Sequence, residues 1–224
     1  MKRFSTIFII VLSVLVVAGC INTNKVEKRE NNKKEEKKNI EHPDLAVYEL
    51  NGNVKSVKWY FNNFGVEELG FVLAFDENGM ATKHWYEEIW DEDVDVVVKR
   101  DSLNRISKYS INLKGEELAY LKSEYAYDST GQVASISSKW YNEVSTEETM
   151  TYGNDKRRTK SVSQAVSEDG ETRETIIYEY TGSDANGNWT ERKGFKTIEE
   201  ADGTGYAIID EGTLIERREI EYYR

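Results

Sequence analysis

Acidic side chains are the most plentiful groups in this sequence that could carry out chemistry. Histidine occurs only at His42 and His84, and His42 lies in a polar, charged stretch, so a Ser-His-Asp site or a histidine-ligated metal would depend on His84. A lone histidine between charged and aromatic neighbours in a strand is ordinary. Paired carboxylates can hydrolyse glycosidic bonds, but 41 acidic residues supply such pairs everywhere. We therefore predict no catalytic residue, and keep a carbohydrate-processing enzyme with paired carboxylates as the alternative.

Two acidic stretches, residues 91–95 and 184–188, resemble halves of calcium-binding loops. An EF-hand loop needs glycine at its sixth position and a bidentate glutamate at its twelfth. The residues at these positions are Val96 and Ser102 in the first stretch and Trp189 and Phe195 in the second. Both stretches fail this test, so we predict neither a metal nor a cofactor; a weak adventitious calcium site in a turn is the alternative.

Cys20 is the only cysteine in the chain, and its position suggests lipidation. Lys2 and Arg3 precede an apolar run over residues 7–18, which is shorter than the roughly 20 residues that span a bilayer and is typical of a signal peptide. The following V-A-G-C resembles a bacterial lipobox, where cleavage before the cysteine precedes acylation, for example with palmitate. We expect a signal peptide over residues 1–19 and a lipid on Cys20; an incidental cysteine is the alternative.

Residues 20–43 are expected to be the lipidated cysteine and a flexible, charged tether. Asparagine, lysine and glutamate dominate this stretch, which buries too little apolar surface to offset the entropy of ordering it. About 22 flexible residues would reach roughly 26 Å on average. Pro43, the only proline, marks the change in composition, and we place one folded domain over residues 44–224. A chain anchored in this way would lie at the cell envelope, with the outer membrane or cell surface of a Gram-negative bacterium favoured.

The charge of the domain excludes one class of partner. From Pro43 onward the sequence has 36 acidic and 21 basic residues, a net charge of −15. Such a surface repels nucleic-acid phosphates. We therefore exclude nucleic acid as a partner and expect the membrane, through the lipid, together with a glycan or an envelope protein.

A short turn unit recurs along the domain and predicts its architecture. Its clearest copy is Y-D-S-T-G-Q-V at residues 127–133, where an aromatic residue ends a strand, aspartate opens a turn and glycine supplies the positive φ that the fourth position needs. The leading positions of the copies are Tyr48, Phe75, Arg100, Tyr127, Tyr152 and Tyr180. They give a period of about 26 residues, which indicates a repeat architecture.

A second set of turn signals falls between these copies, so we expect a turn about every 13 residues. Each strand then has about nine residues. Leu69, Phe71, Leu73 and Phe75 alternate with other residues at the period of a strand. We predict an all-β, antiparallel meander of about fourteen strands, curled into an open sheet, a half-barrel or a folded-over sheet, with no helix after the tether. The charged residues of the last segment, 213–224, predict an open sheet edge.

Three Trp-Tyr pairs are the candidate ligand-binding residues. They are Trp59 and Tyr60, Trp85 and Tyr86, and Trp140 and Tyr141. Neighbouring residues of a strand point to opposite faces, so each pair would place one ring on each side of the sheet. An exposed row of rings could stack on sugars or on a partner protein, whereas rings in the core and in cross-strand pairs are the simpler interpretation.

The Y-D-x-x-G-x-V stretch at residues 127–133 resembles the YD repeat of the RHS family of large bacterial surface and secreted proteins. Together with the lipobox, L-N-G-N-V-K at residues 50–55 and G-N-W-T at residues 187–190 are similar to bacterial envelope lipoproteins. The resemblance implies a β-hairpin array at the cell envelope and assigns no catalytic residue. We expect a non-enzymatic binding or scaffolding lipoprotein, with a secretion-linked relative of RHS proteins as a further alternative.

Overall fold

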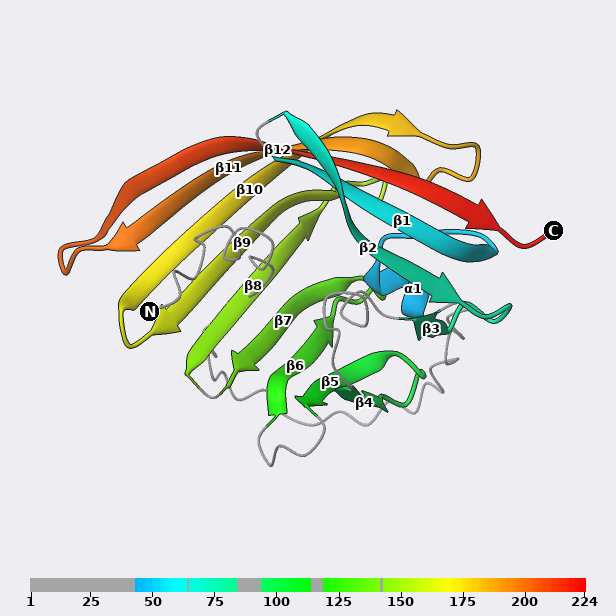
Figure 1. Cartoon of the computed structure of the whole chain (residues 1–224), viewed down its shortest axis with the longest axis horizontal. Coiled ribbons are helices and arrows are strands. Elements are labelled where there is room, and N and C mark those ends of the chain that lie inside the picture. Colours follow the sequence, from blue (N-terminus) through cyan, green and yellow to red (C-terminus); the bar gives the residue numbers. More distant parts are fainter. Residues whose placement is uncertain (1–42, 64, 84–93, 114–118, 142) are drawn as a thin grey trace, which may run out of the picture.

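The computed structural model describes residues 43–63, 65–83, 94–113, 119–141 and 143–224. It contains a short helix, α1 (Pro43–Val47), and one antiparallel sheet of twelve strands (Figure 1). The strands are β1 (Val54–Asn63), β2 (Val66–Phe75), β3 (Ala81–Lys83), β4 (Val94–Arg100), β5 (Ile106–Leu113), β6 (Ala119–Tyr127), β7 (Val133–Trp140), β8 (Val144–Tyr152), β9 (Arg158–Ser167), β10 (Gly170–Ser183), β11 (Trp189–Ala201) and β12 (Tyr206–Tyr222). The predicted all-β, curled, open sheet is confirmed.

Two details of the prediction differ from the described structure. The described residues form twelve strands rather than about fourteen, because β10, β11 and β12 have 14, 13 and 17 residues and exceed the expected nine. The domain also begins with a single helical turn, α1, where no helix was expected. Pro43 fits the first turn of a helix and Asp44 favours its N-terminal end, but five residues are too few to show helical periodicity.

The order of strands in the sheet is β3-β2-β1-β12-β11-β10-β9-β8-β7-β6-β5-β4. Strands β4 to β12 form the predicted meander, and the first three strands attach to its end because β1 pairs with β12, from Val54 opposite Tyr222 to Asn62 opposite Ile215. The prediction of an open edge over the last segment is therefore wrong for residues 215–222. Their charged side chains instead serve neighbours, as when Arg217 pairs with Glu67 of β2 at 2.8 Å.

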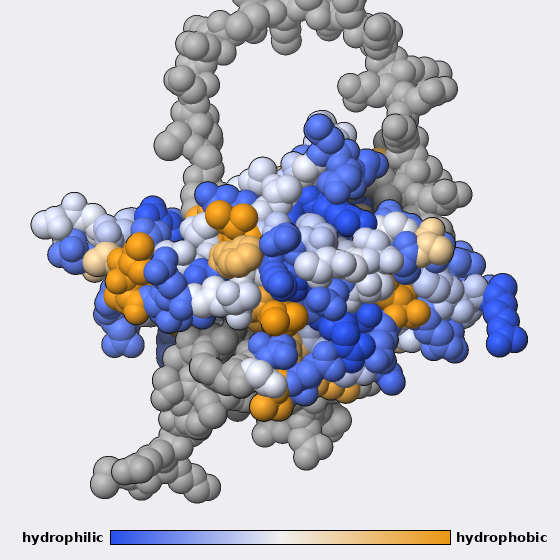
Figure 2. Space-filling view, turned by 90° about the horizontal axis from the view of Figure 1, so that it is seen from above, coloured by the Kyte–Doolittle hydropathy of each residue, from blue (hydrophilic) through white to orange (hydrophobic). Residues whose placement is uncertain are grey.

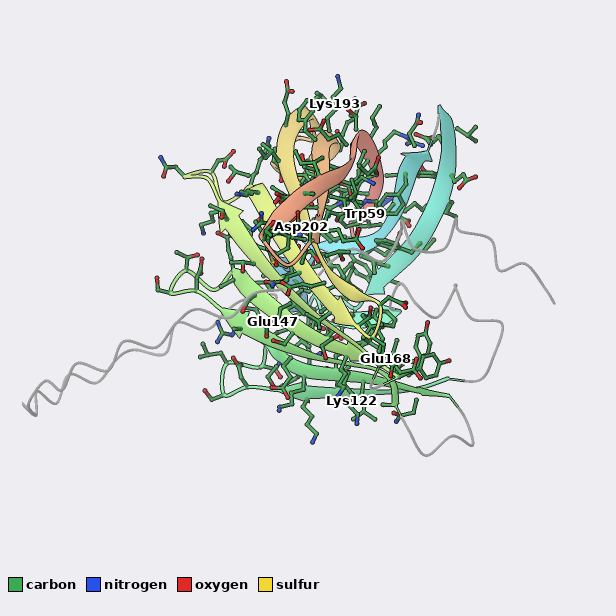
Figure 3. All side chains as sticks on the ribbon, turned by 90° about the vertical axis from the view of Figure 1, so that its left-hand side faces the viewer. Trp59, Lys122, Glu147, Glu168, Lys193 and Asp202 are labelled. Carbon is green, nitrogen blue, oxygen red and sulfur yellow. The ribbon has the colours of Figure 1, made fainter. Side chains whose placement is uncertain are left out.

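The curl of the sheet brings its two edge strands towards α1. Asp44 is fully buried, accepts a hydrogen bond from the backbone N–H of Ala81 in β3 at 2.8 Å, and forms a 2.7 Å ion pair with Arg100 in β4. The two edges share no ladder among the described residues. In Figure 3, Trp59 lies inside the curl while Lys122 and Lys193 lie on its outer surface. One carboxylate of α1 therefore ties both ends of an open sheet together.

The aspartate turns form as their chemistry predicts. The side chains of Asp76, Asp101, Asp128 and Asp184 each accept hydrogen bonds from the backbone N–H groups two and four residues later. The fourth residues have positive φ: 71° at Gly79, 64° at Asn104, 91° at Gly131 and 80° at Gly187. In the degenerate copy that starts at Gly153, Lys156 takes this conformation with φ of 63°. Five of the repeated turns thus share one backbone geometry.

The tyrosines that lead three of these units have a role that the turn chemistry does not predict. Each hydroxyl donates a hydrogen bond to the first residue of the preceding strand. The bonds run from Tyr127 to the carbonyl of Ile106 at 2.7 Å, from Tyr152 to that of Val133 at 2.8 Å, and from Tyr180 to that of Arg158 at 2.9 Å. These carbonyls lie beyond the last backbone pair of each hairpin, so each tyrosine extends its hairpin where the ladder ends.

Residues 43–50, which we call the N-terminal plug, fill the inside of the curl. Leu45 and Leu50 belong to an apolar cluster with residues of β1 and β2, and Val47 packs against the two clusters formed by β5 to β8. The plug continues the chain directly from the expected tether. Its side chains therefore make the contacts that a ligand would make in an empty half-barrel.

Candidate functional site

Three predicted site residues, Cys20, Trp85 and Tyr86, lie outside the residues that the structure describes. The same holds for His84, the expected signal peptide and the tether up to residue 42. In the described part of the chain, no helix has the length and apolar character needed to span a bilayer. The other two Trp-Tyr pairs are described, and their environments differ.

Trp59 and Tyr60 lie on opposite faces of β1, as predicted. Trp59 is 9 % exposed, lies inside the curl and donates its indole N–H to Glu216 at 3.2 Å. Tyr60 lies on the outside, where its hydroxyl donates to Glu219 at 3.0 Å and the Arg217 guanidinium lies 4.1 Å from its ring centroid. Both rings already have partners, so this pair offers no free stacking surface.

Trp140 and Tyr141 do not follow the alternation of a strand. Trp140 ends β7, and Tyr141 follows in the left-handed region with φ of 45°, so the alternation of a strand stops between them. Tyr120 meets both rings edge-on, with its ring centroid 5.4 Å from that of Trp140 and 4.5 Å from that of Tyr141. Tyr141 is 47 % exposed. We call these three residues the aromatic corner.

A group of buried charges, which we call the arginine cluster, lies under β8 to β12. Its members are the cations Arg158, Arg192 and Arg218, the carboxylates Glu49, Glu148 and Glu216, and the rings of Trp59 and Trp189. Buried charges cost several kcal/mol each unless they are paired and hydrogen-bonded. The geometry of their partners therefore decides what this group can do.

Glu49, at the end of the plug, is the centre of the arginine cluster. One carboxylate oxygen lies 2.7 Å from Nε of Arg158, and the other accepts hydrogen bonds from the indole of Trp189 at 3.0 Å and from Arg192 at 3.3 Å. Burial alone would raise the pKa of Glu49, but the three arginines outweigh it and lower this pKa to about 2. Glu49 has a backbone φ of 55°, so the plug takes a left-handed turn to present this side chain.

Arg218 is held by rings and backbone rather than by an ion pair. Its guanidinium carbon lies 3.7 Å from the ring centroid of Trp59 and 3.5 Å from that of Trp189. Its terminal nitrogens donate to the backbone carbonyls of Tyr48 at 2.8 Å and Glu49 at 3.5 Å. Burial, opposed by Glu49 and reinforced by Arg192, holds the pKa of Arg218 well below its ordinary value. The Arg218 guanidinium thus binds the plug through the backbone carbonyls of the plug.

Glu148 differs from Glu49 in that its pKa is raised rather than lowered. It is 1 % exposed, and one oxygen lies 3.3 Å from Arg158, while the other has no hydrogen-bond partner among the described residues. Burial raises its pKa; Arg158 opposes this effect, but the nearby charges of Glu49 and Glu174 add to it, and the pKa reaches about 7. A buried acid with a pKa near neutrality can exchange a proton, but this one has almost no surface for a substrate.

The described residues contain no group of three or more histidine, cysteine, aspartate or glutamate side chains that could hold a metal ion. The second calcium-like stretch is a turn, because Asp184 accepts the backbone N–H groups of Asn186 and Asn188 at 2.9 Å. The first stretch, at residues 91–95, lies mainly outside the described residues. The prediction of no metal and no cofactor stays a prediction.

The sequence analysis missed the whole arginine cluster. Its members come from the plug and from β1, β8, β9, β11 and β12, and no local pattern joins them. One signal was present, because β12 carries charges at four successive positions, 216–219, and therefore on both faces. Charges on both faces of a strand indicate either an isolated ribbon or buried ion pairs. We interpreted them as an edge.

Comparisons with protein-family models, with curated proteins and with solved structures find no match to this chain.

Proposed function

We propose that the protein is a non-enzymatic binding module of the cell envelope, and that its aromatic corner binds the sugar rings of an envelope glycan. The observation that carries the proposal is the exposed ring of Tyr141 beside Tyr120 and Trp140. The interior offers no comparable surface, because the plug and the arginine cluster fill it. The corner is thus the described site where aromatic rings gather and remain accessible.

The backbone supports a binding role for the corner. A non-glycine residue at positive φ costs on the order of 1 kcal/mol, and such costs are found where a side chain must take a set position. The backbone N–H of Tyr141 donates to the carbonyl of Tyr120 at 3.0 Å, which fixes the left-handed residue against the neighbouring strand. The ring of Tyr120 then packs edge-on against its ring. Rings fixed in this way can stack on a sugar with little loss of side-chain entropy.

The envelope location rests on the sequence. Cys20 in its lipobox would carry the lipid, and the tether would give the domain an average reach of about 26 Å from the membrane surface. The outer membrane or the cell surface is the compartment that we propose. A lipid-anchored domain with exposed aromatic rings is suited to binding a glycan of the envelope. Metabolic labelling with a fatty-acid analogue, compared between the wild type and Cys20→Ala, tests the anchor.

One observation favours a second candidate, an acid-base enzyme acting on carbohydrate. Glu148 has a pKa raised to about 7, and Glu174, also buried, lies two strands away, with Ser163 of β9 between them. Against this function stands the 1 % exposure of Glu148, since a glycosidase acid must reach the glycosidic oxygen. Glycan hydrolysis that is abolished in Glu148→Gln would support the enzyme over the binding module.

A third candidate is a secretion-linked relative of RHS proteins. It is supported by the shared backbone geometry of the aspartate turns at Asp76, Asp101, Asp128 and Asp184, which gives the resemblance at residues 127–133 a physical basis. Genes for a secretion apparatus beside the gene for this chain would support it.

The binding proposal is tested with a glycan array, followed by calorimetry on the glycans that bind. Tyr141→Ala should weaken binding about tenfold, the effect expected for the loss of one well-placed aromatic contact. Tyr60→Ala is the matched control, because it removes a tyrosine from the outer face of β1 and should leave the affinity unchanged. Equal losses in the two variants, or an array with no bound glycan, would contradict the proposal.

A further inference from the structure

Half of β12 is paired on one side only. From Tyr206 to Arg217 this strand pairs with β11, but its pairing with β1 begins only at Ile215. Residues 206–214 therefore have no paired strand on the β1 side among the described residues. Figure 1 shows this part of β12 projecting with β11 beyond the β1–β2 hairpin, as the outer strand of the projection. A row of backbone N–H and C=O groups lies along this open edge.

The same segment is exposed on both faces. All seven residues from 207 to 213 are exposed, although they form regular strand. They include Ile208 and Ile209, which are 60 % and 56 % exposed. Viewed from above, the molecule shows its apolar residues as separate islands between hydrophilic ones (Figure 2). Two adjacent exposed isoleucines on a projecting strand therefore form a small apolar site on a surface of mixed polarity.

Several devices that protect an open edge are absent from this one, although it has a β-bulge. Residues 206–214 contain no proline and no lysine, and the open stretch is about nine residues long rather than very short. A bulge interrupts the ladder between Ile198 and Glu199 and leaves Ile209 as the extra residue. By contrast, β3, one of the two strands that end the sheet order, has three described residues. The edge of β12 is thus open to strand addition in a way that β3 is not.

Charge decides which strand this edge fits. Residues 198–213 carry five acidic side chains, Glu199, Glu200, Asp202, Asp210 and Glu211, and no basic one. Two of them pair with cations from outside this range, Asp210 with Lys196 at 3.2 Å and Glu199 with Arg173 at 2.8 Å, so the edge stays acidic overall. Antiparallel pairing of two copies of this edge would bring Asp210 and Glu211 of each copy close to those of the other, which is unfavourable. An incoming strand with lysine or arginine would find opposite charges instead. The acidic edge therefore disfavours a second copy and favours a basic partner.

We propose that residues 206–213, within the open edge of β12, bind an extended, basic segment of a partner protein as an added antiparallel strand. The backbone groups of the edge supply the hydrogen bonds, Ile208 and Ile209 pack against apolar side chains of the partner, and Asp210 and Glu211 set its charge. This surface is separate from the aromatic corner, which lies at β6 and β7, so the two proposals stand or fall independently.

The probe is a capped peptide of about eight residues that alternates valine and lysine, matched to the length of the edge. Hydrogen exchange of the intact protein should slow at residues 206–213 when the peptide is added, and nowhere else. A peptide that alternates valine and glutamate should give no protection. A valine-lysine peptide with N-methyl groups at alternate residues should also give none, because it cannot complete the ladder. Equal protection by the N-methylated peptide would overturn strand addition.

Two charge-reversal variants complete the test. Asp210→Lys with Glu211→Lys should weaken binding of the valine-lysine peptide about tenfold, as expected for two exposed charges turned from attraction to repulsion. Glu168→Lys with Asp169→Lys changes the net charge equally at the β9–β10 turn and should leave binding unchanged. Equal loss in both variants would mean non-specific attraction, and absence of protection in the wild type would also overturn the proposal. Association of the protein with itself through residues 206–213 would show that a second copy is the partner.

Discussion

The N-terminal plug contacts two regions of the curled sheet that hold it by different means. Under β1 and β2, Leu45 and Leu50 join Val57, Leu73 and Phe75 in an apolar cluster. Under β9 to β12, the plug meets the arginine cluster, in which a single carboxylate accepts contacts from Arg158, Arg192 and Trp189. The same eight residues thus contact an apolar cluster on one side and buried ion pairs on the other.

The arginine cluster contributes to the position of the plug rather than to the strength with which the plug is bound. Apolar burial stabilises in proportion to area and tolerates small shifts of the packed groups. An ion pair in the interior roughly cancels its desolvation cost, so it adds little net stability, but it is strongly unfavourable when one partner is misplaced. The leucines therefore provide most of the binding energy of the plug, and Glu49 fixes its position. Substitutions on the two sides should separate these roles.

Glu49→Ala should have the largest effect on stability. It leaves three buried guanidinium groups with two carboxylates, Glu148 and Glu216, and Arg218 already has no carboxylate partner among the described residues. Breaking a buried pair by removing one partner costs about 3 to 5 kcal/mol. Urea unfolding at neutral pH measures this loss. Glu49→Gln, which keeps the shape and the hydrogen-bond acceptor, should cost less; a loss below about 1 kcal/mol for both variants would show that Glu49 does not hold the plug.

Leu45→Ala tests the apolar side and should cost about 3 kcal/mol, the usual price of removing a fully buried leucine side chain. Leu45 is 1 % exposed, so the cavity has no access to water. Leu69→Ala on the outer face, where the side chain is half exposed, is the control and should change the free energy of unfolding by less than about 0.5 kcal/mol. Similar losses in the two variants would contradict the assignment of the plug to the core.

Much of the fold could be predicted because its turns are local. The role of Asp128 depends on backbone groups within four residues, and Gly131 is needed for a φ that few other residues adopt. The antiparallel meander follows from such turns at regular spacing. The aromatic pair at Trp140 failed only because β7 ends there, so the strand rule no longer applied to Tyr141. Boundaries of strands are where a periodic pattern gives least information.

The candidate sites could not be predicted because they depend on distant pairing. Trp59 of β1 lies opposite Arg218 of β12, and nothing in either segment specifies the other. Once that pairing exists, Arg218 lies between two tryptophans and over the backbone of the plug. The open half of β12 is a consequence of the same pairing, since β1 is shorter than β12 and covers only part of it.

Glu148 should make the protein less stable as pH rises, whereas Glu49 should do the reverse. The folded pKa of Glu148 is about 7, above its unfolded value of 4.5, so the folded state binds the extra proton and stability falls between pH 4.5 and 7. The folded pKa of Glu49 is about 2, so its contribution is present above pH 4.5 and is lost as pH falls from 4.5 towards 2. For these two groups together, stability is greatest near pH 4.5.

The variant Glu148→Gln distinguishes the pH dependence of stability due to Glu148 from that due to Glu49. It should flatten the dependence of the unfolding free energy between pH 4.5 and 7, where the wild type should lose on the order of 2 to 3 kcal/mol. At pH 8 the variant should be more stable than the wild type, since Arg158 keeps Glu49 at 2.7 Å. The loss below pH 4.5 should persist, because it belongs to Glu49. An unchanged slope between pH 4.5 and 7 in Glu148→Gln would assign the titration to another group.

The smallest effect compares two tyrosines that make the same bond in the two kinds of surroundings. Among the described residues, the Tyr127 hydroxyl donates to the carbonyl of Ile106, whereas the Tyr180 hydroxyl donates to the carbonyl of Arg158 and also lies 3.3 Å from the carboxylate of Glu49. Tyr127→Phe should cost about 1 kcal/mol, and Tyr180→Phe about twice as much, because the single hydroxyl hydrogen of Tyr180 lies between a carbonyl and a buried carboxylate and is lost to both. Thermal unfolding of the single variants, with Tyr141→Phe as an exposed control, gives both values. In the double variant Tyr180→Phe with Glu49→Gln, the excess loss at Tyr180 should disappear, since the charge that it stabilises is gone. Equal losses at Tyr127 and Tyr180 would show instead that the hydroxyls serve only the hairpin ends, and that the arginine cluster gains nothing from the repeat tyrosine beside it.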